Sequence, residues 1–143
     1  MATESSATTV WQGSLTEGSG NTAPSSGAFP GVEVTWAART ESAEGKTSPE
    51  ELLAAAHASC YCMALSHELT EAGNEPERLE ATATVAFVPG EGVKSSHIVV
   101  RGRVAGIDQA QFEEAARSAG EGCPISGALK GNVDITVDAT LES

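Results

Sequence analysis

Three cysteines are the residues of this 143-residue chain whose type and spacing point to chemistry. Cys60 and Cys62 stand two positions apart in the almost uncharged segment AAAHASCYCMALS, and Cys123 stands alone before a proline. In a helix two residues rotate the chain by about 200°, so the sulfurs of Cys60 and Cys62 face apart. We expect them neither to bond to each other nor to clamp a metal, since no second close pair of Cys or His follows.

A thiol reacts as its thiolate, so the groups near each cysteine decide which one is active. Cys123 is predicted at a helix N-cap, where free backbone N–H groups and the helix dipole lower a thiol pKa. It can equally serve only as a small capping residue. Cys60 lies well inside its predicted helix, where the dipole gives no help, so a cation must come from elsewhere.

Two side chains near Cys60 in the sequence are candidates for activating it. Arg39 ends a predicted strand on its solvent side, and an arginine beside a buried thiol favours the thiolate and can orient a peroxide oxygen. Arg39 also fits an ordinary edge-strand residue. His57 shares a helix face with Cys60 at a spacing of three and is either a base or a satisfied buried residue.

The composition excludes several classes of function. The formal net charge of −12 opposes binding to a nucleic-acid backbone. We expect no membrane span and no secretory signal, which predicts a cytoplasmic protein. An odd number of cysteines fits poorly with a secreted disulfide framework, so the thiols are more readily catalytic, redox-active or metal-binding.

The elements that must position these residues follow from periodicity and capping. Short strands are predicted within the first forty residues, among them residues 8–15 and 31–39, and the second would carry Arg39. A long helix is predicted from Ser48 as N-cap, through Glu51 of a Ser-x-x-Glu capping box, to about Ala72. It is apolar or small nearly all round, so it needs cover on every side.

The remaining pattern predicts strands at 78–88, 97–105 and 132–143. A second helix is expected from the Asp108 N-cap to about Ala119, and a short third one from Cys123 to Gly131. The order β-β-β-α-β-β-α-α-β indicates one α+β domain over residues 1–143, with a largely antiparallel sheet packed on the long central helix. Because one sheet covers only one side of that helix, we expect a second copy to cover the other, giving a homodimer.

The segment EGKTSPEELLAAAHASCYCMALSHELTEAG, with GCPIS further on, resembles the osmotically inducible protein C (OsmC) family, which includes the organic hydroperoxide resistance proteins. The resemblance covers essentially the whole chain and is greatest to the OsmC branch. It implies an intertwined homodimer with active sites at the subunit interface. It also implies a cysteine-based peroxidase that needs no cofactor and no metal.

By position, the resemblance makes Cys60 the attacking cysteine and Cys123 the resolving one. Arg39 matches the arginine that activates the thiolate, and Glu50 the glutamate that holds this arginine. Cys62 matches no active-site position. Glu50 and Cys60 are ten residues apart, hence about 15 Å along one helix, so a Glu50 that serves Cys60 is expected from the partner chain.

The predicted function is reduction of organic hydroperoxides, and of hydrogen peroxide less well, with an external thiol or dithiol as reductant. A Cys60 sulfenic acid and a Cys60–Cys123 disulfide would be its intermediates. The first alternative is a redox sensor or partner-binding switch that uses the same cysteine pair and turns over slowly. The second is a structural protein with inert buried thiols.

Overall fold

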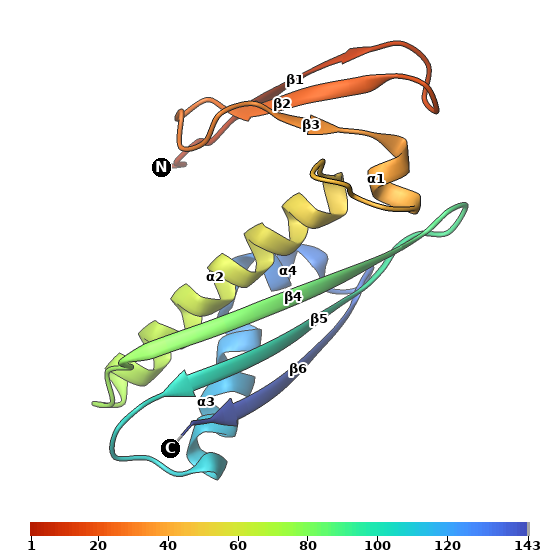
Figure 1. Cartoon of the computed structure of the whole chain (residues 1–143). Coiled ribbons are helices and arrows are strands. Elements are labelled where there is room, and N and C mark those ends of the chain that lie inside the picture. The colour runs from red at the N-terminus through yellow and green to blue at the C-terminus, as the bar shows by residue number, and fades with distance from the viewer. Residues whose placement is uncertain (143) are drawn as a thin grey trace. The chain divides into compact units, whose positions relative to one another are not determined.

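The computed structural model describes residues 1–142 and divides into two compact units, Met1–Leu52 and the chain from Leu53 onward (Figure 1). The first unit holds three strands, β1 (Ala7–Gln12), β2 (Ser19–Pro24) and β3 (Val32–Val34), in an antiparallel sheet of that order. A short helix α1 (Trp36–Thr40) follows, and then the first turn of α2 (Pro49–Glu71).

Helix α1 corrects the prediction of one strand over residues 31–39. The strand ends at Val34, and Arg39 lies in the last turn of α1 instead of on a strand. The cause is local, because the Thr35 hydroxyl accepts a hydrogen bond from the Ala38 N–H and caps a helix in which Ala37 and Ala38 are good helix formers.

The second unit is a sheet with helices packed on it (Figure 1). Strands β4 (Arg78–Val88) and β5 (Gly92–Arg103) pair antiparallel, and β6 (Asp134–Leu141) pairs parallel with β5. Helices α3 (Gln109–Gly122) and α4 (Pro124–Leu129) come between β5 and β6. The α+β class is confirmed, with α1 added to the expected order and two three-stranded sheets in place of one.

Helix α2 buries one stripe of side chains spaced four residues apart. His57, Tyr61, Leu65 and Leu69 are buried, and the last three share one apolar cluster with inward residues of β5 and α3. Within the described chain, Ala55, Ala56, Ser59 and Met63 on α2 are exposed. The apolar helix therefore has one face without cover in a single copy, as the sequence predicted.

Capping explains where the helices begin and end. The Ser48 hydroxyl accepts from the Glu51 N–H, but the Glu51 carboxylate accepts from the Thr47 hydroxyl, so only half of the expected capping box forms. The Asp108 capping box of α3 is complete. Helix α3 runs three residues past Ala119, because the Cys123 N–H closes its last turn on the Ala119 carbonyl.

Over residues 1–142, no helix combines the length and the apolar character needed to cross a bilayer.

We predict that Gly102→Ala lowers the free energy of unfolding by about 1 to 3 kcal/mol. A Cβ at Gly102 on β5 would lie 2.5 Å from the ring of Phe112, which is fully buried and has no room to withdraw. Urea unfolding measures this change, as a lower midpoint concentration of urea than in the wild type with the same slope of the free energy against urea.

Gly120→Ala is the matched control, since a Cβ there meets its nearest atom only at 4.0 Å. Because Gly120 lies inside α3, its replacement by alanine should raise the free energy of unfolding by up to about 1 kcal/mol. Equal midpoints for the two variants would contradict the tight packing of Phe112 on β5.

Candidate functional site

Two of the three cysteines meet in the second unit. The Cys60 sulfur, from the middle of α2, lies 3.2 Å from the Cys123 sulfur, which stands at the N-cap position of α4. Both are free thiols, and Cys123 is 1% exposed. Because a disulfide bond is about 2.05 Å long, a displacement of about 1.2 Å would join the two sulfurs.

The surroundings act on the two thiols in opposite directions. Burial raises the pKa of Cys60, which a backbone N–H at Ile125 only partly offsets, and contact with Cys123 raises it further. Burial also acts to raise the pKa of Cys123, but hydrogen bonds from the Ser126 and Ile125 backbone, the Cys60 thiol and the Ser126 hydroxyl outweigh it. The pKa of Cys123 is thus below its ordinary value, although its sulfur makes no regular capping hydrogen bond.

Cys62 lies apart from this pair, as helix geometry predicted. It is partly buried beside β4, and burial raises the pKa of its thiol. It lines an open hollow together with Met63, His67 and Arg78. Within residues 1–142, Cys62 has no thiol partner.

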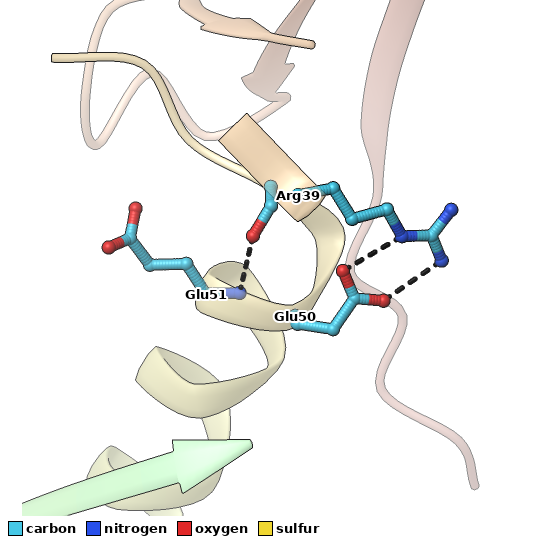
Figure 2. Close-up of polar contacts among 4 residues, drawn as sticks. Arg39, Glu50 and Glu51 are labelled. Atoms are coloured by element: carbon cyan, nitrogen blue, oxygen red, sulfur yellow. Dashed lines mark hydrogen bonds and ion pairs between the residues drawn. The ribbon is translucent and has the colours of Figure 1, made fainter. Parts of the chain in front are cut away.

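Arg39 and Glu50 form a two-pronged ion pair in the first unit. Arg39 Nε donates to Glu50 Oε1 and Nη2 donates to Oε2, each at 2.9 Å (Figure 2). The Glu50 side chain is 9% exposed and that of Arg39 29%, so the pair is only partly screened by water. This planar fork fixes the guanidinium orientation more firmly than a single contact would.

The backbone of the first unit brings these two residues together. The Thr47 N–H donates to the Glu33 carbonyl, and Val34 pairs with Thr47 as an isolated parallel bridge. These contacts hold the start of α2 against β3, although α1 separates the two in the chain. The Arg39 guanidinium also lies 5.8 Å from the Trp36 ring centroid, a cation–π contact within α1.

His57 lies in a buried polar network that the sequence did not predict in full. Its Nδ1 is 2.6 Å from the Ser96 hydroxyl of β5, and its Nε2 is 2.7 Å from the Ser126 hydroxyl of α4. Burial lowers the pKa of His57, which favours the neutral ring. His57 is therefore buried with a hydrogen-bond partner on each ring nitrogen, as one of the two alternatives predicted. A signal for Ser96 was present, because it stands on the apolar face of β5 with Ile98.

Two comparisons with known proteins, by family model and by sequence, give the same family. The family model described as OsmC-like protein matches residues 41–138. The chain is 38% identical to peroxiredoxin OsmC of Escherichia coli over 136 residues, which are 93% of each protein.

Solved structures share the fold. An organic hydroperoxide resistance protein OsmC from Legionella pneumophila superposes with a TM-score of 0.69 at 23% identity, covering 96% of this chain and 97% of that one. OhrB of Bacillus subtilis gives a TM-score of 0.67 at 24% identity, covering 94% and 97%. The extent of the family match and the identity to the E. coli protein establish that this chain belongs to the OsmC family.

Proposed function

We propose that the protein is a thiol-dependent peroxidase that reduces organic hydroperoxides, and hydrogen peroxide less well, through Cys60 and Cys123. The observation that carries this proposal is the 3.2 Å separation of two free sulfurs from distant parts of the chain. The names of its relatives, a peroxiredoxin and organic hydroperoxide resistance proteins, support a peroxide-related role.

The reaction has three steps. The Cys60 thiolate attacks the outer oxygen of the hydroperoxide, so the O–O bond breaks, an alcohol leaves and Cys60 becomes a sulfenic acid. The Cys123 sulfur then attacks the Cys60 sulfur, which forms the disulfide and releases the hydroxyl group as water. An external thiol or dithiol finally reduces the disulfide and restores both thiols.

The first step needs a group that counteracts the burial of Cys60. Burial raises the pKa of this thiol, so a chain by itself holds Cys60 mostly protonated near neutral pH. In the proposed assembly, the Arg39 guanidinium of a second copy, oriented by its pairing with Glu50, supplies the positive charge. Ten residues separate Glu50 from Cys60 along α2, about 15 Å, so one helix does not bring them together.

A homodimer is also supported by the uncovered face of α2. Ala55, Ala56 and Ser59 give this face a small-residue surface, and Met63 is 73% exposed on it. Small side chains let two helices approach closely, and an exposed apolar face of this kind favours a partner. A shared site would make the dimer necessary for catalysis as well as for burial.

Apolar surroundings fit an alkyl substrate. Tyr61, Leu65 and Ile98 belong to the same buried cluster as Cys123, and Cys60 packs against that cluster. The alkyl group of an organic hydroperoxide displaces water from such a surface. We therefore expect an organic hydroperoxide to bind more tightly than hydrogen peroxide. A single domain, a cytoplasmic location and independence of metals and cofactors remain predictions.

The direct test is consumption of an organic hydroperoxide with a dithiol as reductant. We expect multiple turnover by the wild-type protein, a lower rate with hydrogen peroxide, and loss of turnover in Cys60→Ser. Cys62→Ser is the matched control and should keep its activity. Disulfide formation with negligible turnover would instead favour the sensor alternative, and inert thiols would favour the structural one.

Peptide mapping after one equivalent of hydroperoxide tests the cysteine pairing. With free thiols alkylated before digestion, we expect a Cys60–Cys123 crosslink within one chain and an alkylated Cys62, because only the first pair lies in reach. A crosslink that includes Cys62, or one between chains, would contradict the assignment.

Mixed dimers test the shared site. A Glu50→Ala chain combined with a Cys60→Ser chain rebuilds one complete site if Glu50 acts across the interface, so the heterodimer should regain about half of the wild-type activity. Native mass spectrometry verifies that heterodimers have formed.

The reciprocal heterodimer is the control. A Glu50→Ala, Cys60→Ser double variant paired with a wild-type chain has no complete shared site, yet it keeps one site if both residues act within a chain. Sharing therefore predicts an inactive control and an active mixed dimer. The reverse pattern would disprove it.

A further inference from the structure

His57 is a buried titratable group that the three-step mechanism leaves unused. It is fully buried, and both ring nitrogens are engaged, Nδ1 by Ser96 and Nε2 by Ser126. These hydroxyls come from β5 and α4 and are themselves 0% and 4% exposed. These hydrogen bonds satisfy a buried ring, and they also place both nitrogens in contact with hydroxyl groups that can pass a proton.

The Ser126 hydroxyl connects this ring to the resolving thiol. Ser126 is the third residue of α4, beside the N-cap Cys123, and its hydroxyl and N–H both favour the Cys123 thiolate. Cys123 in turn lies 3.2 Å from Cys60. The groups thus form a continuous path, Ser96–His57–Ser126–Cys123–Cys60, drawn from β5, α2, α4 and the residue that joins α3 to α4.

Burial makes this path important for the second step. Cys123 must lose its proton as its sulfur attacks, but at 1% exposure it is closed to water and to external bases. A proton leaving such a site passes to a neighbouring protein group. Ser126 is the adjacent hydroxyl, and the ring beyond it can accept a proton.

We infer that His57 takes up the Cys123 proton through the Ser126 hydroxyl when Cys123 resolves the Cys60 sulfenic acid, an inference that rests on the proposed function. His57 acts through Ser126, so it is a positioning residue, and Ser126 is the group that contacts the thiol. The ring then holds its proton on Nδ1, donating to Ser96, and leaves Nε2 to accept from Ser126.

Atoms and charges balance over the step. The thiol proton passes to Ser126 while the Ser126 proton passes to His57 Nε2. The Cys123 electron pair forms the S–S bond, and the Cys60 S–O bond breaks with its electron pair on the departing hydroxide. The hydroxide takes the proton that His57 has gained and leaves as water, so the ring ends neutral.

The groups around His57 make its titration simple to interpret. On α2 these are the Cys60 thiol and the Tyr61 phenol, which donates to the Ala116 carbonyl. At the N-cap of α4 it is the Cys123 thiol, and β5 contributes the uncharged Ser96. In the described chain, no carboxylate is paired with His57, and burial keeps its pKa low, so the neutral ring is available as an acceptor.

Single-turnover quenching of His57→Gln tests the inference. Glutamine can keep a hydrogen bond to Ser126 but cannot take up a proton, so a purely structural role would survive the change. We expect disulfide formation to slow by about 100-fold at neutral pH. Cys60 sulfenic acid should accumulate, and the rate should recover at alkaline pH, where Cys123 is ionised before it attacks.

Two further variants keep the test decisive. Ser126→Ala removes the connecting hydroxyl with little change in volume and should show the same pH-dependent delay, even if His57→Gln fails to fold. His67→Gln alters an exposed histidine on the same helix and should leave both steps unchanged. The inference would be overturned if both steps slowed equally at every pH. It would also be overturned if disulfide formation kept its wild-type rate in these variants.

A second oxidant separates this inference from the proposed function. Diamide oxidises the first thiol without a hydroperoxide, and Cys123 must still lose its proton to close the disulfide. If hydroperoxides leave Cys60 unoxidised, the proposed function fails, but slower closure with diamide in Ser126→Ala would still support the relay. Normal closure in that variant would disprove the relay alone.

Discussion

The approach of the Cys60 and Cys123 sulfurs to 3.2 Å is the contact on which the proposed chemistry of this protein depends. It requires the middle of α2 to pack against the N-terminus of α4, two segments 63 residues apart. The buried stripe of α2 supplies that packing, since Tyr61 and Leu65 hold the helix against the cluster that includes α3 and the sheet. The Tyr61 hydroxyl fixes the register by donating to the Ala116 carbonyl at 2.7 Å. Apolar packing thereby determines the distance between two reactive groups.

The same burial that sets this distance works against reactivity. Burial raises the pKa of Cys60, while the start of α4 lowers the pKa of Cys123. Taken alone, these directions would make Cys123 the more acidic thiol, the reverse of the order that the proposed mechanism requires. A positive charge brought to Cys60 resolves the conflict, and the Arg39–Glu50 fork is already built at 2.9 Å with the carboxylate nearly buried. A dimer that places this fork beside Cys60 would therefore couple assembly to activation.

Much of the fold could be predicted because its signals are local. The Asp108 and Pro124 patterns located α3 and α4, and alternation in residues 78–88 located β4. The prediction of one strand over residues 31–39 was wrong. Val32, Val34, Trp36 and Ala38 alternate as in a strand, but the Thr35 cap begins helix α1 instead. The Arg39–Glu50 pair was assigned from the family resemblance and forms within the first unit. The partners of His57 lie 39 and 69 residues away, so helix periodicity revealed its position but not Ser96 or Ser126.

The proposed mechanism requires that Cys60 is oxidised first and that Cys123 resolves it. A stoichiometric titration of reduced protein with an organic hydroperoxide tests this most directly, with thiols counted and sulfenic acid trapped by a dimedone reagent. We predict that the wild type loses two thiols per peroxide and gives no trapped product. In Cys123→Ser we predict the loss of one thiol per peroxide, with the trap on Cys60. A trap on Cys123 in Cys60→Ser, with Cys60 unmodified in Cys123→Ser, would contradict it.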